Sequence, residues 1–334
     1  MNCYNLITFL VPIKDRVHVS KRLIKYLKST PFKINLFVAD GSKTSQKKIF
    51  ETLKRKHNLT FFKSPYDEDF SCFTKKIFNS VKKIKTKYCC FMESDEFINI
   101  NDIDKIIIFM EKNNDCVLVR GTIRNFNVRT KNKIQILNRL YSIDKKLAHT
   151  KINFKNTKKI MPISCWEGVH RTKHFKNIFK LKTKKNLKNV NAILDYIRIY
   201  TQLNGKIKFL ENIVYSFRQA NTHYFDNNPK DINSSANKEI NLSIAGHYKH
   251  FREFLLIFED IIYTNSLNKF LMYCKLLKYY IKREIIHRMY IFFKSYFLKI
   301  YFRFFNTNNY ENLNNDEKLF LSKNGHFFKF NKKF

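Results

Sequence analysis

A short run of acidic residues follows an apolar stretch in the first third of the chain. Residues 88–92 are apolar, and Glu93, Asp95 and Glu96 come directly after them. Acids are scarce here, with 27 Asp and Glu against 64 Lys and Arg. Carboxylate oxygens suit Mg²⁺ and Mn²⁺, which in turn bridge phosphate groups. The run therefore indicates a site for Mn²⁺ or Mg²⁺ with Glu93 and Asp95 as ligands.

The direction of the side chains matters for this interpretation. If the backbone is extended, Glu93 and Asp95 point the same way and share one metal ion. The alternative is that the acids open a surface loop and cap the next helix. Open α/β sheets bind ligands at the carboxyl ends of their strands, which favours the ligand interpretation.

Two other polar segments also follow apolar strands. Residues 11–16 come at the end of the first strand, and Asp40 begins an Asp-Gly-Ser turn at the end of the second. Asp40 is suited to accept a hydrogen bond from a base N–H, while Lys14, Arg16 and Lys76 are suited to face phosphates. An Asp-Gly-Ser turn alone is common and carries little information. Parallel strands would bring all these segments to one sheet edge.

Hydrophobic periodicity predicts the elements that hold these residues. We expect strands over 5–13, 32–39, 59–63, 88–92 and 116–121, and helices over 19–29, 46–57, 73–84 and 103–112. Strands that alternate with helices predict an α/β domain with a mostly parallel sheet. Further on, we expect short edge strands within 122–160, a helix over 192–203 and a strand pair over 206–216.

Composition limits the class of protein. The 334 residues include only 6 Gly and 5 Pro, which excludes collagen-like and Gly/Pro-rich disordered chains. The seven Cys form no Cys-x-x-Cys pair, which predicts a reducing, cytoplasmic environment. We see no signal peptide and no window of eighteen uncharged apolar residues. We expect domains at 1–225 and 240–305, and a low-complexity, flexible tail at 306–334.

The formal charge of +37 has two explanations. A basic protein attracts nucleic acid or an anionic membrane. Lys is also spread along the whole chain, as an AT-rich coding sequence would give, and this accounts for most of the excess. Residues 267–305 interleave aromatic residues with Lys and Arg, which predicts a helix on the inner membrane surface or one packed on the domain or a second subunit. No nucleic-acid motif is present, so no such partner is expected.

The order of these motifs has a counterpart in a known family. Val-Pro-x-x-Asp-Arg at 11–16, Ala-Asp-Gly-Ser at 39–42, Lys76 at the start of a helix and Phe-Met-Glu-Ser-Asp-Glu-Phe at 91–97 resemble family 2 glycosyltransferases of the GT-A fold. The resemblance covers about residues 5–225 and implies a mixed, mostly parallel sheet between helices, followed here by a helical C-terminal extension. It implies that a nucleotide-diphosphate sugar contacts the strand ends, with Pro12, Asp15 and Ser94 among the binding residues.

The resemblance continues downstream. The segment around Trp166 and Glu167 is similar to the one that lines the family's acceptor pocket, and we assign Trp166 to sugar-donor binding. The family's Glu-Asp pair corresponds to Leu194-Asp195, which implies Asp195 as general base at the beginning of a helix, with Glu167 in reserve. The resemblance also implies that His223 lies near the metal and the diphosphate.

The implied activity is metal-assisted transfer of a sugar, with inversion, to a glycan or glycolipid acceptor in cell-surface polysaccharide or lipopolysaccharide assembly. A sugar-phosphate nucleotidyltransferase is an alternative, but it needs a Gly-rich phosphate loop and residues 11–16 contain no Gly. A non-enzymatic basic protein that binds membrane or nucleic acid is another. That alternative leaves the acids at the strand end unexplained.

Overall fold

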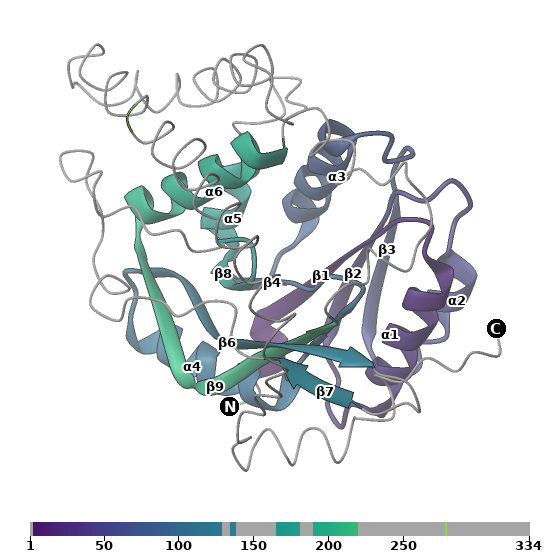
Figure 1. Ribbon diagram of the computed structural model, residues 1–334, viewed down its shortest axis with the longest axis horizontal. Helices are drawn as coiled ribbons and strands as arrows, with labels where there is room; N and C mark the ends of the chain where they lie inside the picture. The colour runs from purple at the N-terminus through teal and green to yellow at the C-terminus, as the bar shows by residue number, and fades with distance from the viewer. Residues whose placement is uncertain (1–2, 129–133, 138–164, 181–189, 220–277, 279–334) are drawn as a thin grey trace, which may run out of the picture.

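The computed structural model describes residues 3–128, 134–137, 165–180, 190–219 and 278 (Figure 1). Its strands are β1 (Ile7–Ile13), β2 (Asn35–Asp40), β3 (Asn58–Lys63), β4 (Tyr88–Phe91), β5 (Glu96–Ile98), β6 (Cys116–Val128), β7 (Ile134–Leu137), β8 (Gly168–Arg171) and β9 (Lys206–Gln219). Its α-helices are α1 (Val17–Ser29), α2 (Lys47–Glu51), α3 (Phe70–Lys83), α4 (Ile103–Lys112), α5 (Thr172–Lys180) and α6 (Val190–Asn204).

In the part of the chain that the structure describes, nine strands form one mixed sheet. The order is β3-β2-β1-β4-β8-β6-β9-β5, and β7 pairs with β6. Strands β3, β2, β1 and β4 are parallel, so their carboxyl ends meet at one edge. Beyond them, β8 runs antiparallel to β4, and β5 runs antiparallel to β9. The predicted α/β class, with a mixed sheet between helices, is confirmed.

Helices cover both faces of this sheet (Figure 1). One hydrophobic cluster joins the sheet to α1 and α4, through residues such as Leu23, Leu27 and Ile107. The other joins it to α3, α5 and α6, through residues such as Ile77 and Phe175. Each fully buried side chain of this size contributes about 1.5–3 kcal/mol to folding. The two clusters hold the strand ends in place beneath the loops.

Two of the predicted elements differ from those in the structure. Helix α2 ends at Glu51, well before the predicted end at residue 57, and the residues that follow it form turns. The segment 206–216 is part of one long strand, β9, and the predicted strand pair is wrong. Polar residues interrupt its apolar pattern, and the structure places them in a bulge where Gly121 pairs with Leu210 and Thr122 with Val214.

Gly121 permits this bulge. A Cβ atom at this position would lie 2.3 Å from the carbonyl oxygen of Ile213, which is too close for any side chain. The backbone of β9 therefore approaches β6 closely enough to continue the pairing as far as Gln219. As a result, β9 brings Arg218 to the same region as the acids that follow β4.

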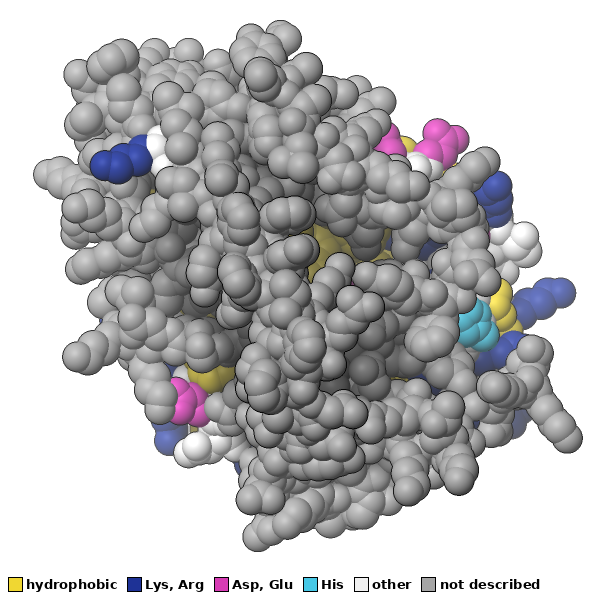
Figure 2. All heavy atoms as spheres, in the orientation of Figure 1, with side chains coloured by type: hydrophobic (Ala, Val, Ile, Leu, Met, Phe, Trp, Pro, Cys, Tyr) yellow, Lys and Arg dark blue, Asp and Glu magenta, His cyan; other side chains and the backbone are white. Residues whose placement is uncertain are grey.

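Several predictions fall outside the described residues. The proposed extension at 240–305, apart from Lys278, and the tail at 306–334 belong to this group. Among the helices that the structure does describe, none has the length and apolar character needed to cross a membrane. Figure 2 shows described Lys and Arg side chains at the margins of the face in view, as the high positive charge leads one to expect.

Candidate active site

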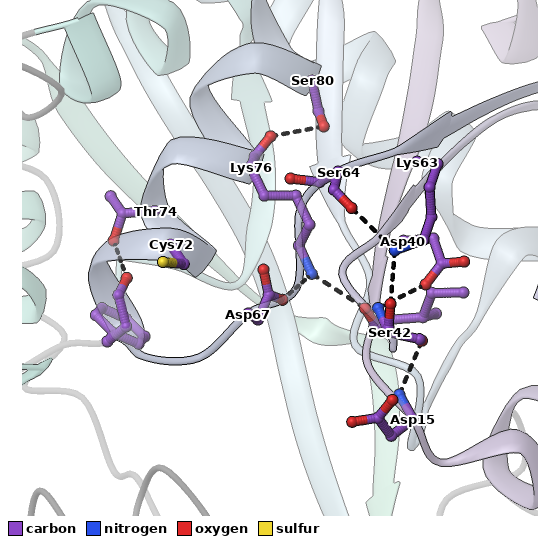
Figure 3. Close-up of polar contacts among 12 residues, drawn as sticks. Asp15, Asp40, Ser42, Lys63, Ser64, Asp67, Cys72, Thr74, Lys76 and Ser80 are labelled. Atoms are coloured by element: carbon purple, nitrogen blue, oxygen red, sulfur yellow. Dashed lines mark hydrogen bonds and ion pairs between the residues drawn. The ribbon is translucent and has the colours of Figure 1, made fainter. Parts of the chain in front are cut away.

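The loops after β1 and β2 are bound to each other by hydrogen bonds (Figure 3). Asp15 has a φ of 51°, in the left-handed region that few residues other than glycine adopt. Its backbone N–H donates to Ser42 Oγ at 2.8 Å, and its Oδ1 accepts from the backbone N–H of Lys43 at 2.8 Å. Asp15 therefore joins the two loops through these two hydrogen bonds. A residue with such an unusual backbone conformation often marks a functional site.

Asp40 is fully buried at the end of β2, and nearby backbone groups use both of its oxygens. Oδ1 accepts from the N–H of Ser42 at 2.8 Å, and Oδ2 accepts from the N–H of Gln46 at 2.9 Å. This carboxylate orders the turn that leads into α2. The contact with a nucleotide base that the sequence predicts stays a prediction.

Lys76 does not open a helix, because α3 begins at Phe70 with Asp69 as its N-cap. It lies in the middle of α3, with a side chain that is 0% exposed. Its ammonium group forms an ion pair with Asp67 and donates to the carbonyl oxygen of Ile13 at 3.0 Å (Figure 3). Burial lowers the pKa of Lys76 and raises the pKa of Asp67, and the ion pair opposes both shifts. Lys76 thus ties α3 to the end of β1.

The acids after β4 lie on a tight turn and contact different arginines. The N–H of Glu96 donates to the carbonyl oxygen of Glu93 at 3.1 Å, which closes a turn around Ser94 and Asp95. The extended backbone expected from the sequence is therefore wrong. Asp95, 5% exposed, lies 3.6 Å from a guanidinium nitrogen of Arg16, whereas Glu93, 36% exposed, lies 3.6 Å from Arg218.

Arg218 lies among three glutamates. Its guanidinium nitrogens are 3.6 Å from Glu93, 3.7 Å from Glu96 and 2.9 Å from Glu167. Burial opposes the charge of Arg218, but the three acids together outweigh burial and raise its pKa. Burial also raises the pKa of Glu93, and it raises that of Glu96 to about 7. For Glu93 and Glu96 the attraction to Arg218 therefore offsets only part of the cost of burial.

Trp166 and Glu167 lie before β8 and have different environments. The Trp166 ring is 7% exposed and lies 4.3 Å from the ring of Phe91, centroid to centroid, within the hydrophobic core. Glu167 Oε2 accepts from Arg120 at 3.1 Å, while Oε1 lies 2.9 Å from Arg218. The structure therefore joins Glu167 to the acids after β4 and keeps Trp166 in the core.

The structure gives fewer contacts for the remaining predicted site residues. Pro12 is buried within β1, and Lys14 lies with its ammonium group 4.9 Å from the ring centre of Tyr66. Asp195 lies in the second turn of α6, because this helix begins at Val190 and not at the predicted position. The structure does not describe the side chain of Asp195, and His223 lies outside the described residues.

The carboxylates of Glu93 and Asp95 could meet the smaller of two possible requirements for binding a divalent cation. In the described ranges, no three His, Cys, Asp or Glu side chains are arranged to hold a metal ion. Mg²⁺, however, is usually bound by one or two carboxylates together with substrate phosphates. Glu93 and Asp95 supply hard oxygen donors on one short turn and could meet that smaller requirement with a bound diphosphate. Their present partners are the guanidinium groups of Arg218 and Arg16.

Sequence reasoning missed three residues that the structure brings into this region. Asp67 belongs to an acid-rich run at 66–69, so the scarcity of acids could have identified it. Arg218 lies at the end of a strand that was predicted to stop at residue 216. Arg120 lies within a strand whose apolar neighbours gave no sign of its contact with Glu167.

Comparisons with known proteins rest on structure alone. Neither the protein-family models nor the curated proteins include a match. Among solved structures, S. aureus TarS 1–349 in complex with UDP matches with a TM-score of 0.51 and 15% identity, over 83% of this chain and 71% of that chain. The same TarS fragment in complex with UDP-GlcNAc matches with a TM-score of 0.49 and 17% identity, over 83% of this chain and 80% of that chain.

TarS is a GT-A-type glycosyltransferase, and the likeness to its UDP complex extends over most of both chains. The fold inferred from the strand-end motifs at 11–16, 39–42 and 91–97 is the fold found. At this level of identity, the likeness concerns the fold. The chain has a GT-A-like fold.

Proposed function

We propose that this protein is a glycosyltransferase that takes its sugar from a nucleotide-diphosphate donor, with UDP as the first nucleotide to test. The observation that carries the proposal is the meeting of Arg16, from the loop after β1, with Asp95, from the turn after β4. Such a strand edge binds ligands in open α/β sheets. The fold, shared with a protein solved in complex with UDP, supports this choice of donor.

The metal belongs to the same proposal. Glu93 and Asp95 would hold Mn²⁺ or Mg²⁺, which when bound neutralises charge on the leaving diphosphate. Lys14 lies at the same edge, where its positive charge favours the phosphates. Asp195 takes the proton from the acceptor hydroxyl, and the anomeric centre inverts. We propose a glycan or glycolipid acceptor and a role in cell-surface polysaccharide assembly, as the resemblance in sequence implies.

A thermal-shift experiment tests donor and metal together. UDP should raise the melting temperature, and Mn²⁺ should increase that shift, because a ligand that binds only the native state stabilises it by about 2.7 kcal/mol at 100 times its Kd. Asp95→Asn should remove the Mn²⁺-dependent part of the shift. Asp115→Asn, an exposed acid paired with Lys206, should behave like the wild type. If UDP does not raise the melting temperature of the wild type, the proposed donor is refuted.

The basic aromatic segment at 267–305 supports a proposal about location. We propose that it holds the protein on the inner face of an anionic membrane, where each nearby Lys or Arg contributes about 1 kcal/mol. The full-length protein should cosediment with anionic vesicles, less with neutral ones, and less at high salt because salt screens charge. Equal recovery on anionic and neutral vesicles would contradict the proposal.

A further inference from the structure

Charged side chains of alternating sign extend from the sheet toward the acids after β4. Arg120 on β6 contacts Glu167, Glu167 contacts Arg218 on β9, and Arg218 contacts both Glu96 and Glu93. Arg120, Glu167 and Glu96 are buried, whereas the side chain of Arg218 is 25% exposed and that of Glu93, at the outer end, is 36% exposed. The series therefore connects the interior of the sheet to the residue that the proposed function assigns to the metal.

Arg218 is the branch point of this series. Glu96 faces Arg218 across the antiparallel pair of β5 and β9, so the sheet itself fixes these two positions. The side chain of Glu96 is fixed in addition by a hydrogen bond with Ser216 Oγ. Glu93, by contrast, lies in the turn after β4, and Glu167 lies before β8. A single guanidinium thus joins two loop acids to a site within the sheet.

The geometry requires arginine and not merely a positive charge. Arginine has two terminal nitrogens in a rigid plane. In Arg218, Nη1 lies 2.9 Å from Glu167, while Nη2 lies 3.6 Å from Glu93 and 3.7 Å from Glu96. Lysine has a single ammonium nitrogen on a flexible stem and cannot occupy both of these positions at once. The buried network is costly to form, since charges lose their hydration on burial, so a positioning role gives a reason for its presence.

We propose that Arg218 is a positioning residue that fixes the carboxylate of Glu93 for the metal and keeps it at a set distance from Glu167. This inference depends on the proposed function, because Glu93 matters here as a metal ligand. Groups that orient metal ligands without touching the metal typically change metal affinity or activity by about 10–100-fold when they are mutated.

The test is the affinity for Mn²⁺ in the presence of saturating UDP, measured by the loss of the free Mn²⁺ signal in electron paramagnetic resonance. Arg218→Lys should weaken Mn²⁺ binding by about 10–100-fold. Its affinity for UDP without metal should stay at the wild-type value. A residue with only a structural role would lower the melting temperature without this selective loss.

A matched control separates the two roles. Arg171 on β8 donates to the carbonyl oxygens of Cys116, Met110 and Asn113 and contacts none of the acids named above. Arg171→Lys should lower the melting temperature and leave Mn²⁺ affinity unchanged. If Arg218→Lys does not fold, the charge-balanced variant Arg218→Gln with Glu96→Gln replaces it, and it should show the same loss of Mn²⁺ affinity.

The outcomes distinguish the inference from the proposal on which it depends. Wild-type affinity for Mn²⁺ in folded Arg218→Lys, or in the double variant, would overturn the positioning role alone. A wild type that binds UDP but not Mn²⁺ would overturn the metal proposal and the role of Arg218 together. A wild type that binds no UDP would overturn the proposed function itself.

Discussion

Asp195→Asn is expected to lower turnover by about 10²–10⁴-fold, the usual contribution of a positioned general base. Asparagine keeps the size of the side chain but cannot accept a proton from the acceptor hydroxyl. Affinity for UDP should barely change, because the proposed donor contacts come from the loops after β1 and β4. The measurement is turnover of the sugar donor that thermal-shift screening identifies, together with the Kd of UDP for both proteins.

Glu167→Gln is the comparison that decides between the two candidate bases. Both oxygens of Glu167 are already engaged, one by Arg120 and the other by Arg218. With both oxygens facing guanidinium groups, this carboxylate is poorly placed to take the proton of an acceptor hydroxyl. We therefore expect Glu167→Gln to lower turnover less than Asp195→Asn does. The reverse order would transfer the role of base to Glu167.

The hydrophobic pattern of the sequence correctly predicted several helices and strands in the first half of the fold. Helix α4 has the predicted bounds, 103–112, because its buried isoleucines repeat at helical spacing between clear ends. Strands β1 and β2 were found because they are buried on both faces and are therefore continuously apolar. Their parallel pairing follows from the helix between them, so the sheet edge that collects the polar loops was predictable.

The candidate site was less predictable, because its geometry depends on long-range pairing. Glu96 was predicted to belong to a cluster of acids after the strand 88–92, but it begins β5 and pairs with Arg218 far along the chain. Nothing in the local sequence indicates this partner. Residue types near the site could be assigned, whereas which acid faces which arginine depends on the register of β9 and on the bulge opposite Gly121.

The contacts of Lys76 also could not be predicted from the local sequence. Among the substitutions considered, its replacement should have the largest effect on stability. Lys76→Met removes one member of a buried ion pair and leaves the buried Asp67 carboxyl without Lys76 as its partner. Removal of one partner from such a pair costs about 3–5 kcal/mol. We expect this decrease in the free energy of unfolding, measured by urea denaturation. Lys54→Met, which breaks an exposed pair with Glu51, should change stability little.

A double variant then tests what Lys76 does for function. Lys76→Met with Asp67→Asn removes both charges, so much of the lost stability should return, since the penalty comes mainly from the unpaired acid. The Lys76 ammonium is fully buried and engaged by Asp67 and Ile13, so we expect the double variant to bind UDP with wild-type affinity. If the variant is stable but binds UDP much more weakly, Lys76 faces the phosphates in the bound state. That result would restore the role predicted from its sequence position.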